Sequence, residues 1–563
     1  MKVLKLPEIR GSLLTLLSIS GFSLVIVSAW GNQIEWLSTG ALFGLYDVVP
    51  LTYWLGVGVM VLSLLLGLRN GNTKVFAVQF LLIYVALWNT PALFERYPSV
   101  WDSYQHYFST LNIINTGSSL SEGLGTYAAN YPGFFVLTAV YSLLGNAPVL
   151  DMLRFYPFVV STFTFVALYL TVRTYVPVLG FRTAMLLCAL GNVWVQYHFS
   201  PQSLGLAAAL LIFVFLEKGG MRWLLMALAA FTYLAISHPT SMFIVVGALA
   251  LREVIVRFRA FRAKEMIGER TWPISIFITV WILWLITGAR MYSYSLVNQV
   301  SDKLYYIYNA PATVEQAAYL RTAGNIFPIS PLVRTSLLGS FFLLFFLATV
   351  ILFLRRRKRQ MRRKTSRTSV FCLVFVSLIL APMDIFFLQG SIYDRALLFF
   401  ALAAPMLFVP VLIIERKRVF KVILLLAVVM AAACAITSTY QESLYVVSDR
   451  SLATTDFLSE VMPAHSTVIG GHYPHPVWRN DAHTPGRVDY YSVFDTPFVN
   501  LTRDGAIAMI FDRTTQLWHL QWGTINLYNT YFNDANDTSK VHNYSRVLDN
   551  GAYLIIYGGA SRI

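Results

Sequence analysis

Apolar runs long enough to cross a lipid bilayer recur along most of this chain, and they constrain its fold more than any other feature. A run of about 20 apolar residues spans the hydrocarbon core as a helix. We expect spans near residues 12–30, 51–68, 75–92, 154–172, 183–197, 203–217, 223–236, 240–252, 273–288, 331–354, 369–388, 395–414 and 420–438. Only 13% of the residues are charged, against about 25% in soluble domains. The sequence therefore predicts a polytopic α-helical membrane protein with about 13 transmembrane helices.

The distribution of Lys and Arg predicts how these spans are oriented. With the N-terminus in the cytoplasm, the inner segments hold 28 of the 43 Lys and Arg residues, including the RRRKRQMRRK stretch that begins at Arg355. Loops rich in Lys and Arg stay on the cytoplasmic side of a membrane. The net charge of +15 therefore indicates topology and contact with membrane lipids, not nucleic-acid binding. We expect a multi-pass protein of the cell (plasma) membrane with a cytoplasmic N-terminus.

One apolar segment, Tyr131 to Gly145, is short for a crossing. If it crossed, every later loop would change sides, and the RRRKRQMRRK stretch would face outward. We therefore expect this segment to lie along the outer surface as an interfacial helix. The first long outer loop then runs over residues 93–153, and a second outer loop runs over 289–330.

From about residue 440 onward, the composition is that of a soluble domain. The stretches STVIGG, GAIAMIFD and GAYLIIYGG indicate strands bounded by glycine. All three Asn-x-Ser/Thr sequons, at Asn500, Asn536 and Asn543, fall in this region, and sequons are glycosylated only on the outer side. We expect residues 1–439 to form the membrane module and residues 440–563 to form a small extracytoplasmic α/β domain.

Ionisable residues at the outer face are the candidates for chemistry, because charged groups near lipid are costly and are usually functional. Asp102 and His106, in the first outer loop, are spaced to share one face of a helix. A carboxylate there could act as a general base, and together with His106 it could hold a divalent metal. The alternative is a capped and solvated loop helix. The sequence requires no cofactor and leaves metal dependence open.

Several segments, taken in order, resemble the GT-C superfamily of membrane glycosyltransferases, in particular its protein-mannosyltransferase and aminoarabinose-transferase branch. Asp102 is followed by YPGFFVLTAVYSLLG and then by a span that begins APVLDMLRFYPFVV. The segments VQYHFSPQSLGLAAALLIF, from Val195, and ISHPTSMF, from Ile236, resemble archaeal and actinobacterial members. YDRALLFFALAAP, from Tyr393, resembles an Arg-containing motif that opens a late helix. The acidic motif departs from the pattern, since Ser103 follows Asp102 where many relatives have Asp-Glu.

The resemblance implies an inverting glycosyltransferase. It would transfer a sugar from a polyprenyl (dolichyl)-phosphate-linked donor to an outer-face glycan, lipid or protein acceptor, with Asp102 as general base. Guanidinium groups would hold the lipid phosphate, because they match its oxygens. The site residues implied are catalytic Asp102 and His106, phosphate-binding Arg395, Arg290, Arg321 and Arg154, and cavity-lining His198, His238, Asp394 and Tyr131.

Alternatives stand beside these roles. Arg154 could snorkel at a helix end, His198 and His238 could cap helix ends, and Arg395 could pair with its acidic neighbour. A glycan polymerase or ligase would also use outer-loop Arg and His residues. A carrier (flippase) of lipid-linked glycans should show two related halves with broken helices and midplane charges, and the sequence shows no such halves. A non-catalytic envelope assembly protein would not need the outer-loop carboxylate.

Overall fold

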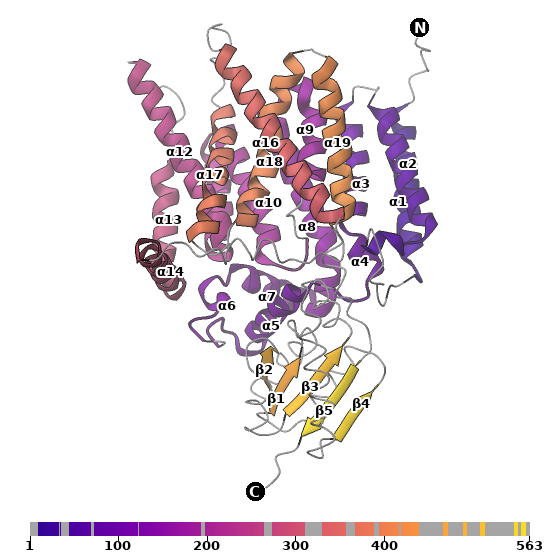
Figure 1. The fold of residues 1–563 in the computed structure, drawn as a ribbon, viewed down its shortest axis with the longest axis vertical. Coiled ribbons are helices and arrows are strands. Elements are labelled where there is room, and N and C mark those ends of the chain that lie inside the picture. The colour runs from indigo at the N-terminus through magenta and orange to yellow at the C-terminus, as the bar shows by residue number, and fades with distance from the viewer. Residues whose placement is uncertain are drawn as a thin grey trace.

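The protein, described here by a computed structural model, is a bundle of helices with a β-sheet beyond one end (Figure 1). The structure describes residues 10–32, 34, 44–68, 72–98, 100–121, 123–192, 197–263, 273–309, 329–355, 366–387, 393–415, 418–438, 466–470, 488–492, 507–512, 545–549 and 553–558.

Every predicted span overlaps a helix. These helices are α1 (Gly11–Ala29), α2 (Leu51–Gly67), α3 (Thr73–Trp88), α8 (Val149–Tyr175), α9 (Val178–Leu190), α10 (Pro201–Lys218), α11 (Met221–Ser237), α12 (Pro239–Ala263), α13 (Ile274–Thr287), α16 (Ile329–Arg355), α17 (Ser366–Phe387), α18 (Tyr393–Ile414) and α19 (Arg418–Ser438). Among them, α9 ends before the span predicted at 183–197 does. Within the described residues, six helices are long and apolar enough to cross a membrane, or seven if one bent pair counts as a span. A helical membrane protein is thus confirmed, and the count of 13 spans stays a prediction.

Prolines and glycines set several helix ends in the bundle. α8 follows Pro148 and stops shortly before Pro177, since proline has no N–H for a helix interior but is tolerated at its first turn. α10 likewise begins at Pro201 and is followed by Gly219, whose φ of 64° suits glycine. These breaks place the start of α10 at the same end of the bundle as the first outer loop.

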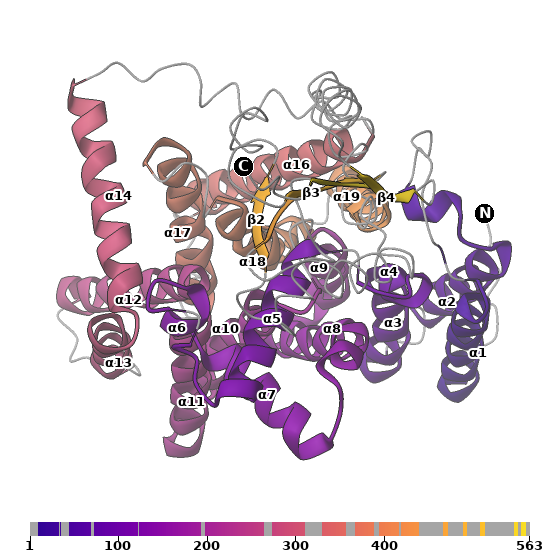
Figure 2. The ribbon, with the colours of Figure 1, turned by 90° about the horizontal axis from the view of Figure 1, so that it is seen from below.

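Three helices of the segment 93–153, which the sequence predicts as the first outer loop, lie across that end of the bundle. They are α5 (Trp101–Thr116), the short α6 (Tyr127–Asn130) and α7 (Gly133–Gly145), and Figure 2 shows α5 and α7 lengthwise when the bundle is seen from below. α7 lies so close to α11 that a Cβ on Gly133 would overlap the side chain of Ser237. The crosswise direction of α7 agrees with the interfacial helix that the sequence predicts for this segment.

The second outer loop begins with a sharp bend. The chain turns by 89° between α13 and the first part of α14 (Arg290–Asn309). α14 therefore lies crosswise to the bundle helices along one side of the bundle, with its start near α6 (Figure 2). Two shorter elements, η1 (Gly44–Asp47) and α4 (Thr90–Phe94), complete the helices that the structure describes. The bend brings the second outer loop against the first.

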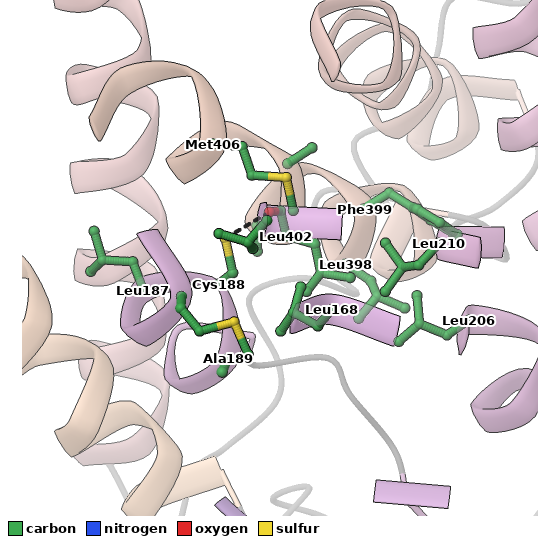
Figure 3. Close-up of a cluster of buried hydrophobic side chains, with 14 of the residues drawn as sticks. Leu168, Leu187, Cys188, Ala189, Leu206, Leu210, Leu398, Phe399, Leu402 and Met406 are labelled. Atoms are coloured by element: carbon green, nitrogen blue, oxygen red, sulfur yellow. Dashed lines mark hydrogen bonds between the residues drawn. The ribbon is translucent and has the colours of Figure 1, made fainter. Parts of the chain in front are cut away.

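The interior of the bundle is apolar where α8, α9, α10 and α18 meet. Figure 3 shows Leu168, Leu206 and Leu402 in one apolar cluster with Cys188, whose thiol donates a hydrogen bond to the Leu402 carbonyl over 3.0 Å. Cys188, Cys372 and Cys434 are all buried and free, so they pack as small core residues. This packing fixes α10 and α18 relative to each other, and both helices begin at the site described below.

The C-terminal region contains a five-stranded sheet of order β2-β1-β3-β5-β4. Its strands are β1 (Ser466–Gly470), β2 (Val488–Ser492), β3 (Ile507–Asp512), β4 (Ser545–Asp549) and β5 (Tyr553–Gly558). β1 pairs in parallel with β2 and β3, and β5 pairs antiparallel with β3 and β4. The three stretches that the sequence predicts as strands coincide with β1, β3 and β5. A separate extracytoplasmic α/β domain over 440–563 stays a prediction.

Candidate active site

A cavity of about 500 Å³ lies where α5, α6 and α7 meet the first turns of α10 and α18. This volume is within the range of about 300–1,000 Å³ that is usual for small-molecule sites. The residues that line the cavity are Asp102, Gln105, His106, Phe108, Ser109, Thr126, Tyr127, Ala128, Phe135, Ser200, Pro201, Gln202, His238 and Arg395.

α5 carries the carboxylate of the cavity. Asp102 lies in its first turn, where the helix dipole favours negative charge. One turn later, Nε2 of His106 lies 3.1 Å from Oδ2 of Asp102. The His106 ring packs against Phe135, with ring centroids 5.5 Å apart. The helical spacing that the sequence predicts therefore places these two side chains in direct contact.

A second histidine reaches the same carboxylate from a distant part of the chain. His198, between α9 and α10, has its Nε2 atom 3.2 Å from Oδ2 of Asp102. A carboxylate can only accept, so the proton of each imidazole must be on Nε2 for these hydrogen bonds to form. The sequence predicts His198 as cavity-lining, and the structure places it beside the carboxylate instead of among the lining residues.

The two imidazoles decide the charge state of Asp102. Burial by itself would raise the pKa of this carboxyl, but the hydrogen bonds and charge interactions with His106 and His198 act against burial, and the pKa lies well below its usual value. Asp102 is therefore ionised at neutral pH. Its Oδ1 atom has no hydrogen-bond partner among the described residues, so this oxygen is available to a hydroxyl in the cavity.

Aromatic side chains build the wall beside Asp102. Tyr127 lines the cavity and donates a hydrogen bond from its hydroxyl to the Ser237 carbonyl over 2.8 Å. Tyr131, predicted as cavity-lining, packs behind Tyr127 with ring centroids 5.6 Å apart, and also contacts Tyr292 of α14 at 5.1 Å. The backbone N–H of Tyr292 donates to Oδ1 of Asn130 over 3.1 Å. These contacts tie the second outer loop to the first.

His238 enters the cavity from the turn between α11 and α12. Its Nδ1 atom accepts a hydrogen bond from the backbone N–H of Ser241 over 3.2 Å. Gly205 of α10 has no side chain, and a Cβ there would lie 3.5 Å from the Cβ of His238, so the imidazole packs closely on α10. Burial, together with the charges of Arg395 and His106, lowers the pKa of His238 to about 3. His238 is therefore a neutral imidazole.

The guanidinium of the cavity comes from the first turn of α18. Arg395 lines the cavity and donates from Nη1 to Oδ2 of Asp394 over 2.6 Å. The start of α18 is held in turn by Asp384, whose Oδ2 accepts from the backbone N–H of Tyr393 over 2.6 Å. Arg395 thus pairs with its acidic neighbour, the alternative that the sequence left open, and it also lines the cavity. Its role in binding a phosphate stays a prediction.

The other predicted phosphate-binding residues are placed differently. Arg154 and Arg290 are not among the residues that line the cavity, and Arg321 lies outside the described residues. Within the described part of the chain, no group of three His, Cys, Asp or Glu side chains could hold a metal ion. Asp102 and His106, the suggested metal ligands, are hydrogen-bonded to each other.

Sequence reasoning missed the uncharged polar residues of the cavity. Gln202 and Ser109 line it, but a search for ionisable groups does not find them. The Ser-Pro-Gln-Ser segment at the start of α10 carries the signal of a helix beginning at proline. That signal could have placed Gln202 in the first turn of a helix, at the end of the bundle where the cavity lies.

Neither a protein-family model nor a curated protein sequence matches this chain. The resemblance to the GT-C superfamily therefore rests on the residues quoted above, and it enters only as a proposal.

Proposed function

We propose that this protein is a membrane glycosyltransferase of the GT-C type. It transfers a sugar from a polyprenyl (dolichyl)-phosphate-linked donor to an outer-face glycan, lipid or protein acceptor. The observation that carries this proposal is a single cavity lined by both an ionised carboxylate with a free oxygen, Asp102, and a guanidinium, Arg395. A base for the acceptor and a cation for a phosphate leaving group are the two groups that the reaction needs.

The reaction follows from these two groups. The acceptor hydroxyl donates its proton toward Oδ1 of Asp102 while its oxygen attacks the anomeric carbon of the donor sugar. The bond between that carbon and the phosphate oxygen breaks, and its electron pair stays on the phosphate. Arg395 offsets the charge that develops there. Attack opposite the leaving group inverts the anomeric configuration, and His106 and His198 keep Asp102 in place.

The proposal also includes a topology. The chain would cross the plasma membrane 13 times, as the apolar runs predict, with a cytoplasmic N-terminus and with the cavity and the C-terminal domain outside. The basic inner loops support this orientation. The donor and acceptor would then meet at the outer surface, where α5 and α7 lie across the bundle.

The test is transfer of radiolabelled sugar from a panel of polyprenyl-phosphate sugars to a membrane extract. Purified wild-type protein and the Asp102→Asn variant are assayed side by side. We expect the variant to lose at least about a hundredfold in rate, the scale of a general base. Asp151→Asn is a matched control, because Asp151 also lies in the first turn of an outer-face helix but does not line the cavity.

Two outcomes would favour the alternatives. Full activity of Asp102→Asn would remove Asp102 as the base and favour a glycan polymerase or ligase. Binding of lipid-linked sugar by both proteins without any transfer would favour a carrier of lipid-linked glycans.

A further inference from the structure

The first turn of α10 presents unused hydrogen-bond donors at the cavity. Pro201 and Gln202 line the cavity, and Pro201 has no N–H. Within the described chain, the N–H groups of Gln202 and Ser203 form no hydrogen bond. Such N–H groups, with the helix dipole behind them, favour an anion at the start of an 18-residue helix.

The side chain of Gln202 gives independent support for a ligand there. It is only 7% exposed, it lines the cavity, and its amide has no hydrogen-bond partner in the described part of the chain. The amide atoms are not among the fully buried unpartnered atoms of the described residues, so they are open to the cavity and can hydrogen-bond to a bound ligand.

His238 adds a neutral donor on the adjoining wall. The backbone N–H of Ser241 can only donate, so Nδ1 of His238, which accepts from it, carries no proton. The proton of the neutral ring is therefore on Nε2. Because Nδ1 is already occupied and the ring lines the cavity, Nε2–H is the donor that remains for a ligand.

The charges of the cavity limit the charge of that ligand. Arg395 supplies a cation, but Asp394 pairs with it at 2.6 Å, and Asp102 adds a negative charge. An anion at this site would be held by one shared guanidinium and by several neutral donors. A singly charged anion suits this balance, whereas a diphosphate would lack compensating charge.

From these contacts we infer that the start of α10, with Gln202, His238 and Arg395, binds a singly charged phosphodiester and selects it over a diphosphate. The inference rests on the proposed function, in which this phosphodiester joins the lipid to the sugar. Beyond the proposed function, neutral hydrogen-bond donors on α10 and at the α11–α12 turn, from Gln202 and His238, recognise the phosphodiester.

Binding can be measured without any transfer of sugar. The full-length protein in a neutral detergent is titrated by calorimetry with farnesyl methyl phosphate, a single-chain phosphodiester. Farnesyl diphosphate and farnesol serve as the doubly phosphorylated and uncharged comparisons. We expect the phosphodiester to bind at least about tenfold more tightly than either, the scale of one hydrogen bond to a charged group. Equal or tighter binding of the diphosphate would overturn the selection.

The variants assign the donors. Gln202→Leu and His238→Phe should each weaken phosphodiester binding by about tenfold, whereas His238→Gln, which keeps an amide donor, should recover most of it. Arg395→Gln should weaken binding, and Arg154→Gln is its matched control, because Arg154 does not line the cavity. If His238→Phe does not fold, the affinity of Gln202→Leu for the phosphodiester tests the site by itself. Wild-type affinity in folded Gln202→Leu would overturn the site.

Two further measurements distinguish this site from a membrane-phospholipid site and from the proposed function. Short-chain phosphatidylglycerol is also a singly charged phosphodiester, and equal or tighter binding of it would overturn the assignment to a single-chain donor.

Asp102→Asn should bind farnesyl methyl phosphate at least as tightly as wild type, because it removes a nearby negative charge. If farnesyl methyl phosphate binds through Gln202 and His238 but no sugar is transferred, the phosphodiester site is supported and the proposed function is rejected. If sugar is transferred but Gln202→Leu and His238→Phe bind the phosphodiester as wild type does, the proposed function is supported and the phosphodiester site is rejected.

Discussion

His198 lies 96 positions from Asp102 in the chain, yet its Nε2 atom is 3.2 Å from Oδ2 of that carboxylate. His106 reaches the same oxygen at 3.1 Å from one helical turn away. Both rings thus hold one oxygen of Asp102, and the other oxygen is left for a substrate hydroxyl. A carboxylate fixed at one oxygen keeps its orientation during proton transfer, which is the condition for an efficient base.

Replacement of His198 should therefore change both the position and the pKa of the Asp102 carboxylate. We expect His198→Ala to lower sugar transfer by roughly tenfold to a hundredfold, the effect of a misplaced catalytic group. The pKa of Asp102 should rise, because one of the two imidazoles that lower it is gone. Transfer needs the ionised carboxylate, so the loss of activity at acid pH should begin at a higher pH. The pH dependence of the transfer rate measures both effects.

A conservative variant separates positioning from folding. His198→Gln keeps an amide that can donate to Oδ2, so it should recover much of the rate and shift the pH profile less. A lower rate in His198→Ala with an unshifted profile would show that His198 only supports the fold.

The close approach of α7 to α11 predicts unequal effects at the two ends of α7. A Cβ on Gly133 would overlap Ser237 and Ile236, whereas a Cβ on Gly145 would meet only Ala147 at 3.9 Å. Gly133→Ala should therefore lower stability by about 1–3 kcal/mol, the usual cost of overpacking. It should also reduce transfer, because Phe135 of α7 supports His106. Thermal unfolding in detergent measures the loss.

Gly145→Ala is the control at the other end of the same helix. Both positions have ordinary backbone angles, since neither glycine has a positive φ, so only the contacts differ. Equal stability of the two variants would mean that α7 is not packed on α11 as described.

The helices were predictable from the sequence because lipid-spanning segments are continuous in the chain. Each apolar run from 12–30 to 420–438 overlaps a helix, and the short segment 131–145 falls on α7, which lies across the bundle. The 89° bend after α13 was not predictable, because no proline marks it. It depends on packing between α14 and α6, which are more than 150 residues apart.

The candidate site was predictable only in part, for a similar reason. The contact between Asp102 and His106 follows from helical spacing within one segment. The contact of His198 with the same oxygen requires the α9–α10 connection to lie beside α5, and no local pattern encodes that. Spacing also cannot tell that Tyr131 lies behind Tyr127, or that Arg154 is outside the cavity lining.

The tie between the two outer loops predicts a local change in hydrogen exchange. The N–H of Tyr292 donates to Oδ1 of Asn130, whose amide nitrogen donates to the carbonyls of Leu124 and Thr126. Asn130→Leu removes all three hydrogen bonds. Exchange at the Tyr292 amide should then accelerate by about tenfold, which corresponds to the loss of about one hydrogen bond. Hydrogen–deuterium exchange with mass spectrometry measures it, and unchanged exchange there would show that α14 is not held by Asn130.

The low pKa of His238 predicts how stability depends on pH. The pKa of an unfolded histidine is about 6.5, whereas burial and the charges of Arg395 and His106, partly offset by Asp102, lower the pKa of His238 to about 3. Between these two pH values, the unfolded chain binds more protons than the folded chain at this site. Stability from His238 is therefore complete above about pH 6.5 and is lost as the pH falls toward 3.

Thermal unfolding of wild type and His238→Gln between pH 8 and pH 4 tests this sign. The wild-type Tm should fall by about 2 °C or more relative to that of the variant as the pH drops from 7 to 5, because Gln cannot take up a proton. Above pH 7 the difference between the two Tm values should be constant. A difference that grows in the opposite direction would mean that His238 is protonated in the folded protein, and it could not then act as the neutral donor that the cavity requires.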